Sequence, residues 1–534
     1  MRSFASRSGS GSAVNPEPRT RNSELVFLFF GSLLLFLSIW KGPGGYTDLH
    51  EYLDDAERLW TLFNMAVPDD FVEVEDPNDP DNVIEMPRYN RYAVGLAVVS
   101  GPLVLLGDRV EKWTGREGVR RQIAAFTVPL LAAFSTVLVF LLGRELGFHA
   151  RICHWAAIVF AFGSPFVTYT RLFFTEIAIS FFVLLALWSF LRSRARVANS
   201  APSPYPLPQG EGETTASARA ASGEQQLPVA HSRSFLWLLL CGVGLGGAVL
   251  CHYGNVWITA IVWAAFSSIL LYQGLKVSEP IPSEKGLIPA AFRVFAITLG
   301  PLLVLAGILW LNHTRYGHPL DTGYYKYDVE NQIAPEFMLH NFRYAGQWLL
   351  RVPWIVLAVF FGRKLFAREP ILFVGLMMAL VVQDLFWMNY QMLGYFPYRY
   401  QQSLTVLCVP GLFFVGQAIL SRWPKRGLWF AAVFLVVWNL TFVFVGDDSK
   451  SKPFLKHPQA DVSKDPEEKG WLAYVWYMKP FKPGVIDGYG TPISGTQVTV
   501  FLLLLVVGLE LLWLAGRTTT KQHRQDAETP RPPK

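Results

Sequence analysis

The chain has 534 residues, of which 51% are hydrophobic and 16% are charged, and its formal net charge is +6. Soluble domains carry roughly a quarter charged residues, so this composition and a mean hydropathy of +0.28 argue against a soluble domain and for a membrane protein. The modest net charge is spread over loops, and nucleic acid is therefore not an expected partner.

Long apolar runs follow one another along the chain. A membrane-spanning helix needs about 20 apolar residues. Twelve segments fit this description: 25–40, 122–142, 152–170, 172–190, 235–251, 255–273, 292–311, 352–367, 371–393, 403–421, 428–445 and 497–515. A thirteenth run, 92–107, is short and contains Gly101-Pro102. We predict an all-α polytopic membrane protein of about 12 transmembrane helices (11–13), whose first apolar run is a retained anchor and not a cleaved leader.

The basic residues of the short loops bear on the sidedness of the run 92–107. If this run lies on the outer face, all the basic short loops fall on the cytoplasmic side, as the positive-inside rule requires. These loops carry Arg144, Arg151, Arg192, Arg194, Arg196, Lys276, Lys285, Arg363, Lys364, Arg368, Arg422, Lys425, Arg426, Arg517 and Lys521. We therefore predict a juxtamembrane helix over 92–107, cytoplasmic termini, and outward segments 41–121, 312–351, 394–402 and 446–496.

The polar stretches define the domain organisation. Residues 1–24 form a basic N-terminus, and residues 198–232 are rich in Pro, Ser, Ala, Gly and Gln. Both are predicted to be disordered and cytoplasmic, because such composition buries too little apolar surface to fold. The transmembrane core is expected to span 25–421, with C-terminal helices in 422–515 and a disordered cytoplasmic tail in 516–534.

Asp48 is the carboxylate that has the least structural reason for its position. It follows Gly44-Gly45 about eight residues after the first span, where partial desolvation makes a carboxylate a stronger base. The acids directly after it, Asp54, Asp55 and Glu57, are expected to form a solvated acidic face. The acidic run 69–81 is broken by Pro77 and Pro80, and a solvated linker is expected there in preference to a metal site.

Several cations and one acid lie at the predicted outer ends of the spans. Arg91 precedes the run 92–107, and Arg399 lies among aromatic residues before the span 403–421. Each either anchors its helix at the interface or binds a lipid phosphate. Arg171 and Glu176 lie in a tight turn between two spans, where charges are costly unless they are paired or line a cavity. A structural ion pair is the simpler interpretation of this pair.

The four cysteines fall within or beside apolar runs and form no CxxC pair. Buried free thiols are therefore expected, with neither a disulfide framework nor a zinc site. We predict no cofactor and no metal ligands, although a divalent metal is not excluded.

Five short motifs occur in order on the predicted outer face. They are Gly45-Tyr46-Thr47-Asp48-Leu49-His50-Glu51-Tyr52, Arg91-Tyr92-Ala93-Val94-Gly95, Pro165 to Glu176, Tyr316-Gly317-His318-Pro319-Leu320-Asp321-Thr322-Gly323-Tyr324, and Pro397-Tyr398-Arg399-Tyr400. Together they resemble motifs of the GT-C membrane glycosyltransferases, over roughly residues 25–421. The resemblance is closest to the group related to protein O-mannosyltransferases and lipid A aminoarabinose transferases, which use polyprenyl-phosphate-linked sugars.

This resemblance implies a GT-C-type helical bundle with juxtamembrane helices in the first outward loop, and it implies roles for individual residues. Asp48 would be the catalytic carboxylate. Because the neighbouring acid of the family is Leu49 here, Glu51 is the possible substitute. The donor phosphate would be bound by Arg91, Arg399, Arg315 and Lys326. The residues expected to shape the site are Tyr52, Arg171, Glu176, Tyr324 and Tyr400.

The expected function is an inverting glycosyl transfer from a polyprenyl-phosphate donor to a lipid, glycan or protein acceptor, on the outer face of a cytoplasmic membrane. The alternative is a flippase or secondary transporter of a lipid-linked or small polar substrate. A transporter should carry ionisable residues deep in its helices, and Asp384 and Glu510 are the main candidates. A non-enzymatic scaffold is the third possibility, and it leaves the cations on one face unexplained.

Overall fold

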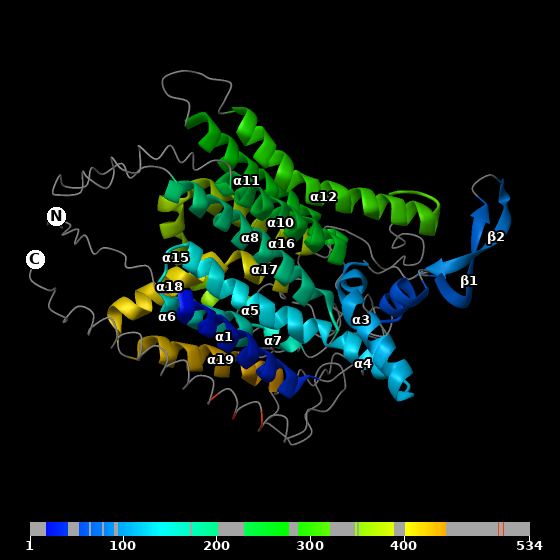
Figure 1. The fold of residues 1–534 in the computed structure, drawn as a ribbon, viewed down its shortest axis with the longest axis horizontal. Helices are drawn as coiled ribbons and strands as arrows, with labels where there is room; N and C mark the ends of the chain where they lie inside the picture. The colour runs from blue at the N-terminus through cyan, green and yellow to red at the C-terminus, as the bar shows by residue number, and fades with distance from the viewer. Residues whose placement is uncertain are drawn as a thin grey trace, which may run out of the picture.

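The computed structural model describes residues 18–40, 53–62, 66–76, 79–89, 94–170, 173–200, 229–276, 287–320, 348–349, 352–388, 401–424, 426–444 and the single residues 500, 503 and 506. Most of these residues belong to a bundle of helices whose axes run broadly in one direction (Figure 1). A smaller group of elements, formed by α3, α4 and a β-hairpin, lies at one end of this bundle.

The helices are bounded as follows. They are α1 (Pro18–Ile39), η1 (Arg58–Leu62), α3 (Gly95–Thr114), α4 (Val119–Ala125), α5 (Thr127–Glu145), α6 (Ala150–Phe162), α7 (Phe166–Tyr169), α8 (Thr175–Ser200), α10 (Val229–Cys251), η2 (Tyr253–Asn255), α11 (Val256–Lys276), α12 (Leu287–Tyr316), α15 (Trp354–Arg368), α16 (Pro370–Met388), α17 (Gln402–Leu407), α18 (Val409–Arg422) and α19 (Gly427–Phe444). The two strands are β1 (Ala66–Asp76) and β2 (Asp79–Tyr89).

The helical membrane fold is confirmed. Within the described part of the chain, six helical segments are long and apolar enough to cross a membrane, and three shorter apolar helices accompany them. Each predicted span from 25–40 to 428–445 overlaps a helix of the structure. The last predicted span, 497–515, lies outside the described residues except for positions 500, 503 and 506. The total of twelve spans therefore stays a prediction.

The apolar run 92–107 lies mostly in α3, which is not among the described helices that are long and apolar enough to span. The second half of α3 carries Asp108, Arg109, Glu111 and Lys112, and burying four charges in hydrocarbon is costly. The helix ends at Gly115, whose φ of 64° is the left-handed conformation that favours glycine. In Figure 1, α3 crosses the end of the bundle instead of running along it, as expected of a juxtamembrane helix.

Strands β1 and β2 form an antiparallel hairpin that projects from this end of the molecule (Figure 1). The run 69–81, predicted as a solvated linker, thus belongs to these two strands except for residues 77 and 78. Val, Ile and Phe favour strands, and Val72 and Val74 alternate with Glu73 and Glu75 along β1. Pro77 lies between the strands and Pro80 is the second residue of β2, where a proline costs little.

Glycines let α10 pack closely between two neighbours. Gly242 meets α12, where a Cβ added at Gly300 would come within 2.2 Å of the Gly242 carbonyl carbon. Gly244 and Gly247 meet α8, close to Phe182. Small residues at helix contacts are the usual basis of packing in membranes, because they let two backbones approach. This packing fixes α10 relative to both neighbours.

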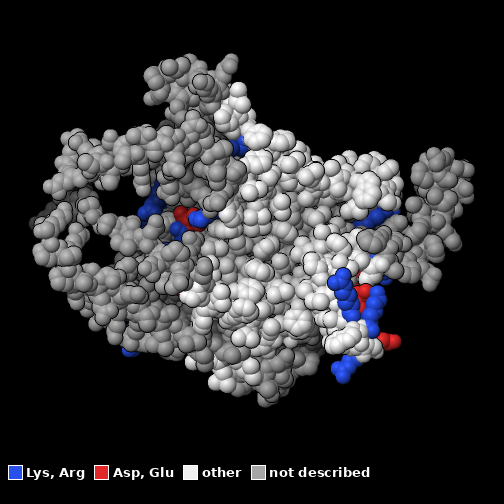
Figure 2. All heavy atoms as spheres, viewed as in Figure 1, with Lys and Arg blue, Asp and Glu red and all other residues white. Residues whose placement is uncertain are grey.

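Ion pairs link helices at the end of the bundle opposite α3. Arg192 Nη1 lies 2.8 Å from Glu145 Oε1, which joins α8 to the end of α5. Arg194 donates both Nη atoms to the Glu369 carboxylate at 3.0 Å, which joins α8 to the residue between α15 and α16. Figure 2 shows charged side chains gathered towards both ends of the visible face, with an uncharged surface between them. This distribution suits a protein whose middle lies in hydrocarbon.

The four cysteines are confirmed as free, buried thiols. Cys153 lies in α6, Cys241 and Cys251 lie in α10, and Cys408 separates α17 from α18.

Candidate functional site

The short turn η2 is the point where several elements meet at the α3 end of the bundle. Helix α10 ends at Cys251 and α11 begins at Val256. The start of α3 presses on this turn, since an added Cβ at Gly95 would come within 2.4 Å of the Cys251 nitrogen. From α16, Gln383 Nε2 donates to the Gly254 carbonyl at 2.9 Å. The turn is therefore held by α3 on one side and α16 on another.

Three buried charged residues lie around this turn. Asp55, Glu176 and Arg315 have exposed fractions of 1%, 2% and 4%. Asp55 and Arg315 both interact electrostatically with the hydroxyl of Tyr253, and Glu176 interacts with Cys251. We call these three residues the buried charge cluster. Removing a charge from water is expensive unless partners or a polar cavity compensate it, so such a cluster marks a functional-site candidate.

Two of these charged residues lie at helix ends whose dipoles stabilise their charge. Glu176 lies in the first turn of α8 and Arg315 lies in the last turn of α12. An acid near a helix N-terminus and a cation near a C-terminus are each stabilised by the helix dipole, by roughly 0.3–1 kcal/mol when exposed and more when buried. The sequence thus supplies charges of the two signs at helix ends that face the same turn.

The turn between α6 and α7 is fixed by a residue from the far end of the sequence. Asn439 of α19 donates its side-chain amide to the carbonyls of Phe162 and Ser164, at 2.9 and 2.7 Å. These bonds satisfy carbonyls at the end of α6 that the helix itself leaves open. This contact therefore links α19 to the turn that leads into α7.

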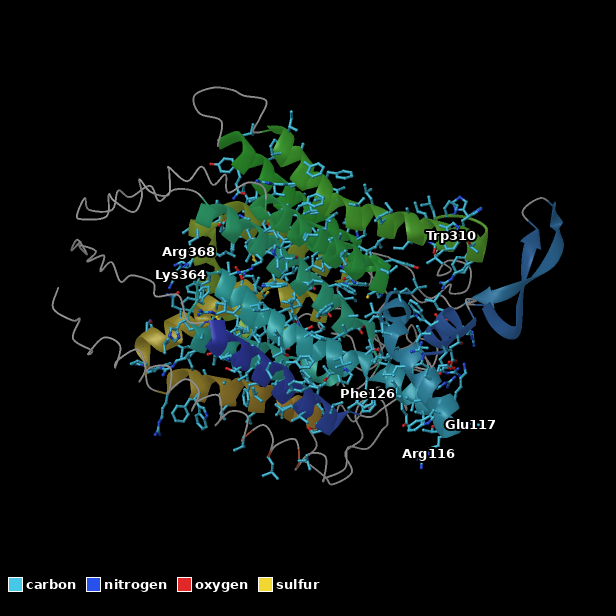
Figure 3. All side chains as sticks on the ribbon, viewed as in Figure 1. Arg116, Glu117, Phe126, Trp310, Lys364 and Arg368 are labelled. Carbon is cyan, nitrogen blue, oxygen red and sulfur yellow. The ribbon has the colours of Figure 1, made fainter. Side chains whose placement is uncertain are left out.

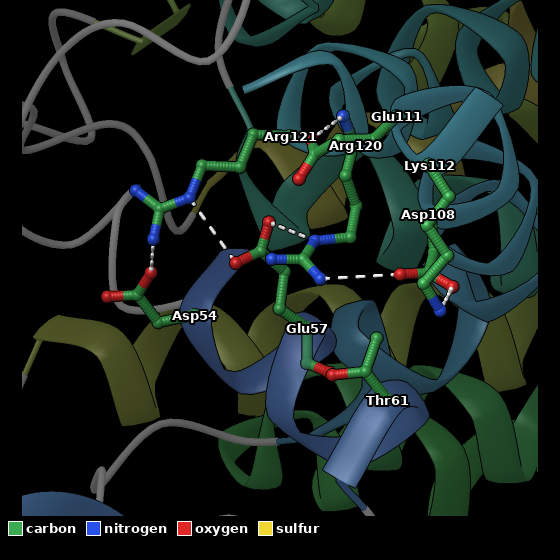
Figure 4. A network of polar contacts seen from close by, with 8 residues as sticks. All are labelled: Asp54, Glu57, Thr61, Asp108, Glu111, Lys112, Arg120 and Arg121. Carbon is green, nitrogen blue, oxygen red and sulfur yellow. Dashed lines mark hydrogen bonds and ion pairs between the residues drawn. The ribbon is translucent and has the colours of Figure 1, made fainter. Parts of the chain in front are cut away.

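An ion-pair network holds the segment 53–62 against α3 and α4 (Figure 4). Arg120 Nε and Arg121 Nε lie 3.1 and 3.4 Å from the two oxygens of Glu57. Arg121 also pairs with Asp54, and Arg120 Nη1 lies 3.6 Å from Asp108. The solvated acidic face expected for Asp54, Asp55 and Glu57 is therefore wrong for Asp55 and Glu57, which are buried.

A tryptophan adds a second attachment for the same segment. Trp60 Nε1 donates to the Ala97 carbonyl at 2.9 Å, and its ring fills the space that Gly101 leaves open on α3. A Cβ added at Gly101 would come within 2.1 Å of that ring. The segment that begins five residues after Asp48 is thus fixed beside the buried charge cluster.

A further carboxyl lies near this end of the bundle. Asp384, in α16, lies near the side chain of Gln401, the residue that precedes α17. On the last described turn of α16, Trp387 contacts the ring of His252 edge-on, with the ring centroids 5.2 Å apart. Asp384 follows Gln383, which bonds to the turn η2, and so lies at this end of the bundle.

The predicted site residues are only partly covered. Glu176 and Arg315 are described, and both belong to the buried charge cluster. The others lie outside the described residues: Asp48, Glu51, Tyr52, Arg91, Arg171, Tyr324, Lys326, Arg399 and Tyr400. Their roles stay predictions. Among the described residues, no group of three or more His, Cys, Asp and Glu is placed to hold a metal ion.

Two residues of the site were not identified from the sequence. The sequence predicts a surface position for Asp55, and Tyr253 lies in no motif. The pair Arg120 and Arg121 is a signal for the ion pairs of Asp54 and Glu57, but it does not distinguish Asp55.

One stretch of the chain matches a known protein family. Residues 116–203, which run from the end of α3 through α8 and include Glu176, match the family of dolichyl-phosphate-mannose-protein mannosyltransferases. No curated protein sequence matches the chain.

Similar solved structures include two membrane enzymes. One is the archaeal oligosaccharyltransferase AglB from Archaeoglobus fulgidus in complex with an inhibitory peptide and a dolichol-phosphate, at 12% identity and a TM-score of 0.46. That match covers 89% of this chain but only 61% of the oligosaccharyltransferase. Another is ArnT from Cupriavidus metallidurans bound to undecaprenyl phosphate, at 11% identity and a TM-score of 0.44, covering 96% of this chain and 81% of that one.

The mannosyltransferase match overlaps one of the five motifs, the stretch from Pro165 to Glu176. Over residues 116–203, therefore, the predicted resemblance to protein O-mannosyltransferases is confirmed.

Proposed function

We propose that the chain is an inverting glycosyltransferase that moves a sugar from a polyprenyl-phosphate donor to an acceptor at the outer membrane face. The observation that carries the proposal is the buried charge cluster beside η2. Three of the motif residues lie within five positions of a described residue in the sequence. Asp48 is five residues before Leu53, Arg91 is three before Val94, and Arg399 is two before Gln401.

Arg315 is the described residue best suited to the donor phosphate. A guanidinium stays charged and presents a planar fork of donors that matches phosphate geometry. Its position in the last turn of α12, nearly inaccessible to water, would strengthen its attraction for an anion. Arg91, Arg399 and Lys326 are proposed to supply further positive charge to the same phosphate.

The proposed reaction is a single displacement. Asp48 accepts the proton of the acceptor hydroxyl or amine, whose oxygen or nitrogen bonds to the anomeric carbon. The bond from that carbon to the phosphate oxygen breaks on the opposite side, and the polyprenyl phosphate leaves with the electron pair. General-base assistance contributes about 10²–10⁴-fold, and fixed cations at the leaving group contribute through electrostatic stabilisation. Glu51 is the second acid available.

Glu176 and Asp55 are proposed to position other groups. Asp55 interacts with Tyr253 in η2, and Glu176 interacts with Cys251 at the end of α10. They would therefore orient the side of the site that binds the donor. Tyr52, Arg171, Tyr324 and Tyr400 are proposed to complete its walls.

The transporter alternative is less well supported by the described residues. It requires ionisable groups deep in the bundle, whereas Asp384 follows Gln383, which bonds to the turn η2 at the end of the bundle. Glu510, the other candidate, lies outside the described residues.

The test uses purified full-length protein and a panel of radiolabelled polyprenyl-phosphate sugars, with release of the lipid carrier as the readout. We expect Asp48→Asn to abolish turnover and keep donor binding, and Arg315→Ala to weaken donor binding at least tenfold. Glu117→Gln is the matched control, because Glu117 is an exposed acid at the same end of the bundle. Near-normal turnover in Asp48→Asn, or carrier movement across a bilayer without sugar release, would contradict the proposal.

A further inference from the structure

A pocket of about 420 Å³ lies between α15 and α18, and it plays no part in the site described above. Its lining includes Lys364 and Arg368 from α15, and Phe414, Gln417 and Ser421 from α18. Figure 3 places Lys364 and Arg368 at the end of the molecule opposite Arg116 and Glu117. The volume falls within the range of about 300–1,000 Å³ that small-ligand sites occupy.

Lys364 and Arg368, the two cations of this pocket, lie one helical turn apart on α15. Both side chains are exposed, and within the described part of the chain neither has an ion-pair partner. The Arg368 guanidinium carbon lies 5.6 Å from the ring centroid of Phe414, a buried side chain, and this contact holds the guanidinium over the pocket. Like charges at this spacing repel each other, so an anion between them would be stabilising.

Two carboxylates at this end of the bundle already form ion pairs with arginines of α8. The acid nearest to Arg368 in the sequence is Glu369, which is bound by both Nη atoms of Arg194. Glu145 is bound by Arg192. Arg192 and Arg194 of α8 are thus paired within the protein, whereas Lys364 and Arg368 of α15 are exposed.

Exposed aromatic rings identify this level of the bundle as an interface between hydrocarbon and water. Phe366 lies between the two cations on α15, and Trp423 follows directly after α18; both are largely exposed. Aromatic rings beside Lys and Arg at the ends of apolar helices are typical of the headgroup region.

We propose that this pocket binds the headgroup of an anionic phospholipid, with Lys364 and Arg368 on its phosphate. Basic pockets between helices at the membrane surface suit such headgroups. Ser421 donates its hydroxyl to the Ala418 carbonyl at 2.8 Å, so the Ser421 oxygen is left to accept a hydrogen bond. Together with the amide of Gln417, it favours a headgroup that also donates hydroxyl hydrogens, such as phosphoglycerol. The site is independent of the proposed sugar transfer.

The test is lipid retention by the full-length protein in native mass spectrometry. Protein is titrated with phosphatidylglycerol, phosphatidylcholine or soluble glycerol phosphate. We compare wild type, the double variant Lys364→Gln/Arg368→Gln and the control Arg363→Gln, whose cation lies 4.5 Å from the Phe360 ring centroid and does not line the pocket. We expect the double variant to bind phosphatidylglycerol about 25-fold more weakly, because each surface cation contributes roughly a factor of five.

Four results would overturn the proposal. In the first, wild type and the double variant retain phosphatidylglycerol equally. In the second, wild type retains phosphatidylcholine as well as phosphatidylglycerol. In the third and fourth, Arg363→Gln loses as much lipid binding as the double variant, or glycerol phosphate competes as well as the lipid. All substituted side chains are exposed, so all variants should fold. Unchanged circular dichroism would show that a loss of lipid binding reflects the pocket.

Discussion

Replacing Gly300 by alanine should separate the two helices that lead to the site. A Cβ at this position would come within 2.2 Å of the Gly242 carbonyl carbon, whereas ordinary contacts begin at 3.4 Å, so α10 and α12 would have to move apart by about 1.2 Å. The atoms that it meets belong to a backbone, which cannot rotate away. Overpacking of this kind costs roughly 1–3 kcal/mol.

Gly307→Ala provides the matched control on the same helix. A Cβ at Gly307 meets nothing within 4 Å, and both substitutions gain the same helix propensity, about 1 kcal/mol. The difference between the two variants therefore isolates the packing cost, and we expect Gly300→Ala to be less stable than Gly307→Ala by about 1–3 kcal/mol. Reversible unfolding in mixed micelles, followed by tryptophan fluorescence, measures this difference. Equal unfolding curves for the two variants would refute the inferred close approach of α10 and α12.

Three further substitutions test the attachments around the site. Glu57→Gln removes a carboxylate that pairs with two arginines and should cost about 1–3 kcal/mol; proteolysis of the loop that follows should accelerate, while the exposed control Glu117→Gln should leave it unchanged. Trp60→Phe loses a hydrogen bond to α3 and should lower stability by roughly 1 kcal/mol on thermal unfolding, unlike Trp113→Phe, whose ring is 86% exposed. Asn439→Ala leaves two buried carbonyls without their donor and should lower the free energy of unfolding by about 1–3 kcal/mol in denaturant titrations. Asn439→Asp should not recover this stability, because an ionised carboxylate cannot donate to a carbonyl.

The helical bundle was predictable because apolar length alone identifies a membrane span, without knowledge of any partner. Each span between α1 and α19 could be read in this way. The hairpin formed by β1 and β2 was missed because its acidic residues outweighed the alternating Val, Ile and Phe. Its prolines were taken to interrupt structure, although one of them lies between the strands.

The site was predictable only where a local motif existed. Glu176 and Arg315 were identified from motifs at the ends of helices, and both are buried around one turn. Asp55 was misassigned because nothing in its own neighbourhood predicts burial. The neighbouring Glu57 pairs with arginines that follow it by 63 and 64 residues. Contacts of such sequence separation depend on the tertiary fold, and no local pattern encodes them.

The burial of all four native thiols has a practical consequence. Maleimide reagents react with accessible thiolates, and thiols enclosed by helices should react slowly. A single cysteine introduced at Glu117 or at Arg363 would then carry nearly all of the label. Because these positions lie at opposite ends of the bundle, a membrane-impermeant reagent added to intact cells would report which end faces outward.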